Sequence, residues 1–520
     1  MSIALNKGFN YINSIECGVS FPPPSVIDEI AGILDVEPEA LFSRYASPRE
    51  HTAFVHGGIL TVAEGRADQF HNARDRADLR RHGAVTVMHS VAKRLALAYT
   101  RSMRENPCGT RQEKMKRNVV FLLCFFVLLL YNESCTIQRR QAVDTKVIEQ
   151  YIEDLMTKST AELPVWNIEK ARAGVKSGWD YIDGCMIMAL LEIYATSGEE
   201  KYLTFADYYE DFRIHDDGTI DGYRKDEWNI DNINGGKNLL TLYRLTKKEK
   251  YRKAAATLFA QVEGQPRTAE GNFWHKEIYP NQVWLDGLYM GLPYYMEYET
   301  LFNGGKNIGD IYRQFRTVRE KMRDEKTGLY YHGYDSSRTA FWADKETGLS
   351  KNFWLRALGW YAMALLDTLN KAPDRGSEDW NALRATFVDL CESMLAFQDA
   401  SGMWYQVPNF PGKGKNYLET SGSAIFAYSL LKGMRTGILE DEKFRDAGKK
   451  AFEGIAGTYL TTDGGKLSLG GICLVAGLGP ETNKRRDGSF DYYMSEPIVK
   501  DDAKGVGPFI LAYNEYKLLH

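Results

Sequence analysis

One helix-length segment of the chain is apolar on almost every side: it reads Val283-Trp284-Leu285-Asp286-Gly287-Leu288-Tyr289-Met290-Gly291-Leu292-Pro293-Tyr294-Tyr295. A helix of this kind packs against neighbours all round, as the inner helices of a closed ring do. The one charged residue in the segment is Asp286. Because burying an unpaired carboxylate is costly, we expect Asp286 to be paired, protonated or directed into a wet cleft.

The chain from residue 144 onward repeats a helical spacing of apolar residues, every three or four positions, in roughly a dozen stretches. We place helices near residues 144–157, 180–197, 200–213, 229–246, 249–263, 282–302, 308–324, 354–371, 378–399, 419–436, 441–459 and 503–519. Long alternation typical of strands is nearly absent. Helices in consecutive pairs predict an all-α fold, in which six hairpins close into an (α/α) toroid. An open solenoid of helix pairs is the alternative, but no strict sequence period indicates one.

The composition argues against one class of function. Of the 520 residues, 44% are hydrophobic and 26% are charged, which supplies a large core. Lys and Arg number 65 against 69 Asp and Glu, so a net charge of −4 argues against nucleic-acid binding through bulk charge. The 31 Tyr and 10 Trp are frequent enough to suggest a cleft for a sugar or planar ligand, although helical cores also use them.

A short apolar run divides the chain. Residues 114–117 are largely basic and residues 119–130 are apolar; as a helix the run spans about 18 Å, too short for a bilayer core of about 30 Å. The pattern predicts a secretory signal peptide over residues 115–135. Ser134-Cys135 resembles a lipoprotein cleavage site, which predicts a lipid anchor at Cys135 and an exported, periplasmic protein. A buried core helix, or a membrane anchor for a cytoplasmic domain, is the alternative.

Residues 1–114 differ in composition from the rest and are interpreted as an unrelated upstream extension without function. Residues 24–42 resemble the end of a phage-repressor helix-turn-helix domain, but the complete module does not fit, so DNA binding does not follow. Residues 144–520 form the predicted barrel domain. The seven cysteines show no metal-binding spacing, and Cys185 and Cys391 fit core positions.

Two acidic residues stand out within apolar stretches. Asp286 follows Trp284 and lies eleven positions after His275, just inside the apolar helix. Asp231 opens another apolar stretch and could face the same cleft, although an N-cap role would explain it equally well. For Asp286 the alternative is a capping or core-paired aspartate.

A third segment combines one histidine with flat and cationic side chains. His332 is followed by Trp354, Arg356 and Trp360, which begin a predicted helix. Arg can hold a carboxylate with two hydrogen bonds, and Trp offers an apolar face to a sugar ring. A solvated arginine and ordinary core tryptophans are the alternative.

The run from His275 to Met290, together with the spacing from His332 to Trp354-Leu355-Arg356, resembles glycoside hydrolase family 105, the unsaturated rhamnogalacturonyl hydrolases. The resemblance covers residues 144–520. The related family 88 of unsaturated glucuronyl hydrolases shares the six-hairpin fold and a pair of aspartates, but matches these motifs less well.

The resemblance implies a reaction on oligosaccharides left by polysaccharide lyases, whose non-reducing end is a uronate with a C4=C5 double bond. An aspartate protonates C4, water adds at C5, and the resulting hemiketal rearranges and releases the neighbouring sugar, without direct displacement at the anomeric carbon. Asp286 would be the general acid and base, and Asp231 would assist it. No metal or cofactor is expected. The implied substrate-binding residues are His275, Trp284, His332, Trp354, Arg356 and Trp360.

The substrate and the class of function leave alternatives. Rhamnogalacturonan fragments are the default, and unsaturated uronides from ulvan, arabinogalactan or glycosaminoglycans are the alternative. A sugar epimerase of the same toroidal shape would typically use histidine bases. A non-catalytic glycan-binding lipoprotein would keep the aromatic residues and Arg356 without needing Asp286. The sequence predicts no oligomeric state.

Overall fold

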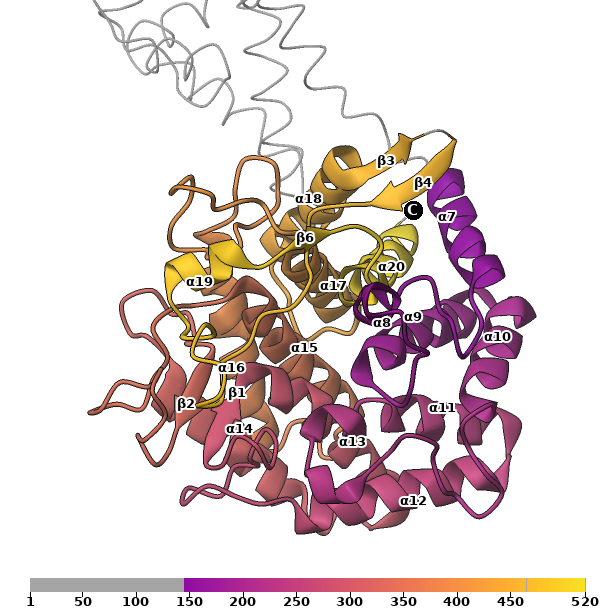
Figure 1. Ribbon diagram of the computed structural model, residues 1–520, viewed down its shortest axis with the longest axis horizontal. Helices are drawn as coiled ribbons and strands as arrows, with labels where there is room; N and C mark the ends of the chain where they lie inside the picture. Colours follow the sequence, from indigo (N-terminus) through magenta and orange to yellow (C-terminus); the bar gives the residue numbers. More distant parts are fainter. Residues whose placement is uncertain (1–144, 464, 520) are drawn as a thin grey trace, which may run out of the picture. The chain divides into compact units, whose positions relative to one another are not determined.

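The computed structural model describes residues 145–463 and 465–519 (Figure 1). The extension over residues 1–114, the signal peptide over 115–135 and the lipid anchor at Cys135 lie outside the described residues. They stay predictions, as does the exported location that depends on them. In the part of the chain that the structure describes, no helix is both long and apolar enough to cross a membrane.

Six helices form the inner ring of the fold. Each packs against the next and the last packs against the first, which closes the ring (Figure 1). These helices are buried nearly all round; in one of them every residue from Leu355 to Leu369 is buried. In chain order they are α9 (Tyr181–Ser197), α11 (Gly236–Thr246), α13 (Leu285–Phe302), α15 (Leu355–Lys371), α17 (Thr420–Arg435) and α20 (Ala503–Lys517).

Each inner helix has an outer partner with one apolar side. On the inner helices in the same order lie α10 (Glu200–Asp211), α12 (Glu249–Gly264), α14 (Ile308–Met322), α16 (Glu378–Leu395), α18 (Glu442–Tyr459) and, on α20, α7 (Thr145–Lys158). In α14, for example, Ile311, Phe315 and Val318 are buried, whereas charged residues occupy the other side. The sixth hairpin joins the two ends of the described chain: the Tyr513 hydroxyl donates a hydrogen bond to Glu149 (2.9 Å).

The predicted fold class, a six-hairpin (α/α) toroid, is confirmed, and the predicted helices form close to the expected bounds except the one over residues 229–246, which begins at Gly236. One difference bears on function: Asp231 does not open α11 but lies in a separate 3-10 turn, η3 (Ile230–Ile233). Residues 229–234 are mostly Asn and Asp, which bond to nearby backbone and favour turns over α-helix. The N–H groups of Asn232 and Asn234 accordingly donate to carbonyls three residues earlier.

Short elements connect the hairpins. The small helices are α8 (Ile168–Ala173), α19 (Phe490–Ser495) and the 3-10 turn η2 (Lys225–Glu227). Three antiparallel strand pairs are β1 (Gln282–Trp284) with β2 (Gly333–Asp335), β3 (Leu460–Asp463) with β4 (Lys466–Leu469), and β5 (Ile472–Cys473) with β6 (Ile498–Val499). The β1–β2 pair sets Trp284 opposite Gly333, at the start of inner helix α13.

The packing of α10 on α9 buries an acid whose titration should be measurable. Glu210 is 4% exposed, accepts a hydrogen bond from Asn238 (3.0 Å), and burial raises its pKa to about 7. The folded chain therefore holds the proton of Glu210 more tightly than the unfolded chain. This stabilises the fold fully below the ordinary pKa near 4.5, and the stabilisation is lost as the pH rises towards 7. The shift corresponds to a loss of about 3 kcal/mol.

We expect Glu210→Gln to match the wild type in acid and to exceed it in free energy of unfolding above neutral pH. Urea unfolding on both sides of this pH window measures the difference. Glu200→Gln, at an exposed position of the same helix, is the control and should follow the wild type throughout. Parallel pH profiles for the wild type and Glu210→Gln would contradict the prediction.

Candidate active site

Asp231 is held in place by residues of two segments. It is 7% exposed, and its N–H donates to the Asn229 side chain (3.1 Å). The Ile230 N–H donates to the His275 carbonyl (3.0 Å), which joins η3 to the segment before β1. That segment also supplies Lys276, whose Nζ lies 2.7 Å from Asp231 Oδ2, and His275, whose Nε2 lies 3.6 Å from Oδ1.

These contacts fix the charge of Asp231. Burial alone would raise its pKa, but the nearby positive charge of Lys276 outweighs this effect and holds the pKa below its ordinary value. Burial lowers the pKa of His275 to about 4, in spite of the attraction of Asp231. At neutral pH Asp231 is therefore an ionised carboxylate beside a neutral imidazole. It has no proton to donate, but it can orient a water molecule or a sugar hydroxyl.

Asp286 has a different setting. It lies in the first turn of α13, and the pairing of β1 with β2 lets the Leu285 N–H donate to the His332 carbonyl (3.1 Å). His332 Nε2 consequently lies 3.1 Å from Asp286 Oδ2, although the angles are not those of a hydrogen bond. The Asp286 side chain is 14% exposed, and no Lys or Arg among the described residues forms an ion pair with it.

The two aspartates lie around one histidine. His275 stacks on Trp284 with ring centroids 4.3 Å apart. Burial lowers its pKa, and the charges of both Asp231 and Asp286 oppose this shift. Trp284 in turn meets the His332 ring edge-on at 5.7 Å. The structure thus brings together five of the predicted residues, Asp231, His275, Trp284, Asp286 and His332, which we call the aspartate cluster. Their roles in a reaction stay predictions.

Trp354 and Arg356 extend the cluster on the side of His332. The Trp354 ring lies 4.9 Å from that of His332, and the Arg356 guanidinium lies over Trp354 at 4.7 Å. Arg356 is 1% exposed and donates to the Ser421 hydroxyl and to the backbone carbonyls of residues 473–474. Both terminal nitrogens of Arg356 already donate hydrogen bonds within the protein. Two hydrogen bonds to a substrate carboxylate would have to come from these same nitrogens. That role stays a prediction.

The structure leaves Trp360 apart from the cluster. It is 1% exposed and stacks on Tyr289 of α13, with ring centroids 4.9 Å and planes 12° apart. Six residues along an α-helix turn the side chain well away from the direction of Trp354. Trp360 therefore packs in the core between the inner helices, and its predicted contact with substrate stays a prediction.

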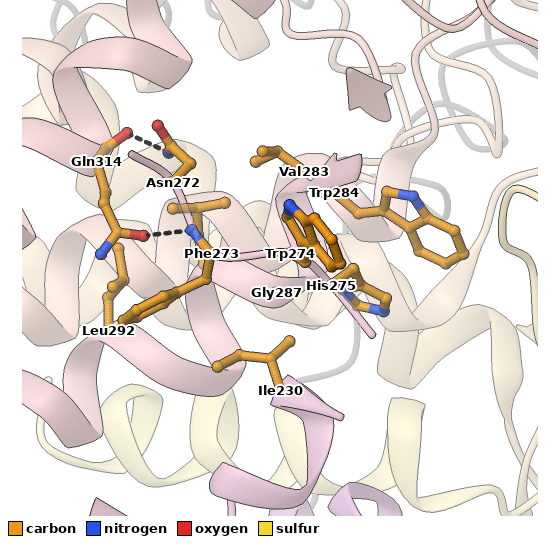
Figure 2. Close-up of a pocket in the computed structure, with 11 residues that line it drawn as sticks. Ile230, Asn272, Phe273, Trp274, His275, Val283, Trp284, Gly287, Leu292 and Gln314 are labelled. Carbon is orange, nitrogen blue, oxygen red and sulfur yellow. Dashed lines mark hydrogen bonds between the residues drawn. The ribbon is translucent and has the colours of Figure 1, made fainter. Parts of the chain in front are cut away.

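A small pocket backs the aspartate cluster (Figure 2). His275 and Trp284 form part of its wall, and Gln314 of α14 lies on the opposite side, where its side chain accepts a hydrogen bond from the Phe273 N–H (3.1 Å). Neither Asp231 nor Asp286 lines the pocket. Their chain neighbours Ile230 and Gly287 do line it, together with His275 and Trp284.

Two residues that touch the cluster carry no sequence-based prediction. Lys276 follows His275 directly, and its place inside that motif is the signal that could have found it. Tyr493 comes from α19, and its hydroxyl lies 2.8 Å from His332 Nδ1. Tyr493 and His332 are 161 positions apart in sequence, and no local pattern marks Tyr493.

Gly287 allows His275 to approach α13 closely. A Cβ at this position would lie 2.9 Å from His275 Nδ1 and 3.2 Å from Ile230 Cγ2. We expect Gly287→Ala to displace His275 and to lower the free energy of unfolding by about 1–3 kcal/mol, the usual cost of overpacking. Thermal unfolding measures this. Gly309→Ala in α14, where a Cβ meets nothing within 4 Å, is the matched control and should be neutral or slightly stabilising. Equal stabilities for the two variants would contradict the close approach.

The chain is similar to one family model and to several known proteins. Residues 149–519 match the family model described as Glycosyl Hydrolase Family 88. A solved family 105 glycoside hydrolase from C. acetobutylicum is 42% identical, with a TM-score of 0.66 that covers 72% of this chain and 100% of that one. Protein Atu3128 of Agrobacterium fabrum is 43% identical over 234 residues, 44% of this chain and 99% of the relative. The unsaturated rhamnogalacturonyl hydrolase YesR of Bacillus subtilis is 25% identical over 259 residues, 49% of this chain and 70% of the relative.

Proposed function

Since this chain belongs to Glycosyl Hydrolase Family 88 and to the related family 105, we propose that it acts on unsaturated rhamnogalacturonan oligosaccharides produced by a lyase. It releases the 4-deoxy-hex-4-enuronosyl residue from their non-reducing end. The rhamnogalacturonyl hydrolase activity of YesR supports this substrate, and the family membership supports a glycosidase over an epimerase or a non-catalytic binding protein.

The observation that carries the proposal is the contrast between two carboxylates around His275. Asp231 is paired with Lys276 and stays ionised, because its pKa is held below its ordinary value. Asp286 has a partly exposed side chain and faces a histidine instead of a lysine or arginine among the described residues. One site thus holds a fixed anion and a second carboxyl group without a lysine or arginine partner among the described residues, and acid-catalysed hydration of a double bond needs two carboxyl groups with such different roles.

The reaction proceeds by hydration. Asp286 transfers a proton to C4 while a water molecule adds its oxygen to C5, and the proton that this water loses returns to the Asp286 carboxylate. The hemiketal at C5 then opens to a ketone, and the hemiacetal left at C1 collapses and releases the neighbouring sugar as an alcohol. Asp231 orients the substrate or the water, and the Trp284 and Trp354 rings line the site.

Ultraviolet absorbance of the conjugated C4=C5 uronate tests the proposal. The purified full chain is mixed with lyase digests of rhamnogalacturonan, ulvan, glucuronan and glycosaminoglycans. We expect the fastest loss of absorbance with rhamnogalacturonan fragments and no release of sugar from saturated fragments of the same polymer. Faster loss with another digest would reassign the substrate. No loss with any digest would favour an epimerase or a binding protein.

A further inference from the structure

Tyr493 is a buried neighbour of the aspartate cluster. It belongs to α19, is fully buried, and its ring lies nearly parallel to that of Trp354, with centroids 6.2 Å and planes 15° apart. Its hydroxyl lies 2.8 Å from His332 Nδ1. On the other side of the same imidazole, His332 Nε2 lies 3.1 Å from Asp286 Oδ2. Tyr493, His332 and Asp286 therefore form a line of three polar groups.

The protonation of Tyr493 restricts the protonation of His332. Burial and the negative charge of Asp286 raise the pKa of Tyr493 well above its ordinary value, so the hydroxyl keeps its proton at neutral pH. Among the described residues, His332 is the partner of this hydroxyl. A buried O–H without an acceptor is costly, so the Tyr493 hydroxyl donates its proton in a hydrogen bond to His332 Nδ1.

We propose that Tyr493 is a positioning residue, which holds His332 in the tautomer with its proton on Nε2. Nδ1 then accepts from Tyr493, and Nε2 carries its proton beside Asp286 Oδ2, at 3.1 Å but outside the angles of a hydrogen bond. This leaves Oδ1 as the oxygen of Asp286 that carries the proton for the substrate. In the opposite tautomer, Nε2 would present a lone pair to Oδ2. A proton on Oδ2 would then be held by the histidine and would not reach C4.

Tyr493→Phe removes the hydroxyl and keeps the buried ring. The kinetic part of the test rests on the proposed function: we expect kcat to fall by about 10- to 100-fold, as with orienting partners of other site histidines, and KM to stay nearly unchanged. Tyr492→Phe is the matched control. Its hydroxyl binds the Gly477 N–H (2.9 Å), so its loss should leave both His332 and kcat unaffected.

A second readout does not depend on substrate. The full chain, with its nine histidines labelled with ¹⁵N, shows which ring nitrogen carries the proton, and His332→Gln identifies the signals of His332. We expect a protonated Nε2 and a bare Nδ1 in the wild type, and a mixture of tautomers in Tyr493→Phe. The wild-type spectrum decides the point even if the variant folds poorly.

Three results would overturn the inference. One is a wild-type His332 with its proton on Nδ1. Another is a Tyr493→Phe variant with unchanged kcat. The third is a fall in kcat with an unchanged tautomer, which would reduce Tyr493 to a packing residue. If the wild type consumes no unsaturated oligosaccharide, the proposed function fails, whereas the tautomer measurement still tests the role of Tyr493.

Discussion

Asp286→Asn is expected to reduce kcat by about 1,000-fold, within the range of about 100- to 10,000-fold that a positioned general acid contributes. Asparagine has the same shape and keeps a side-chain oxygen, but it has no acidic proton to transfer to C4. The substrate should therefore bind to the variant nearly as well as to the wild type. Steady-state kinetics on unsaturated fragments and calorimetric titration of the variant measure the two quantities separately.

The control for this substitution is Asp226→Asn, which makes the same chemical change at an exposed position of η2. It should leave both kcat and binding unchanged. Turnover of Asp286→Asn at the wild-type rate would place the acid elsewhere in the site. Loss of binding in Asp286→Asn with an intact fold would instead give Asp286 a role in holding the substrate, and the assignment of the proton donor would then fail.

The helical ring could be predicted from the sequence because its signal is local. The segment over residues 283–295 is apolar all round, as an inner helix requires, and the outer helix α14 has one apolar side. Each pattern depends on residues within a few turns. The ring closure was inferred from the number of helices in pairs, and the contacts of α20 with α9 confirm it.

The assembly of the aspartate cluster was harder to predict because it depends on pairings between distant short segments. Strands β1 and β2 have three residues each, too few for a recognisable alternation, yet their pairing sets His332 beside Asp286. Tyr493 arrives from α19 in the same way. Motif resemblance pointed to His332, whereas nothing in the sequence pointed to its tyrosine partner.

Residue type alone did not show which cation lies beside which group. The charge of Arg356 suggested a substrate ligand, but the structure engages its terminal nitrogens with backbone carbonyls of residues 473–474. Lys276 drew no prediction, and it is the cation that pairs with Asp231. The sequence shows which cations lie near the motif, but the packing of the chain decides which of them forms an ion pair with Asp231.

Lys276→Met is expected to lower the free energy of unfolding by about 3 kcal/mol, because it leaves Asp231 buried and ionised without its cation. Lys276 holds the pKa of Asp231 below its ordinary value of 3.8, so the pair stabilises the fold above that pH and the effect is lost in acid. The difference between the variant and the wild type should therefore shrink as the pH falls towards this value. Urea unfolding across this pH range measures it.

Two further variants separate the ion pair from other effects of the substitution. Lys276→Arg keeps the positive charge and should retain most of the stability. Asp231→Asn combined with Lys276→Met removes both charges, and since no buried carboxylate is then left unpaired, the double variant should regain most of the lost stability. Its activity should stay low, because the fixed anion beside His275 is gone. A double variant as unstable as Lys276→Met would mean that the lysine acts by packing its stem, and the charge assignment of Asp231 would lose its support.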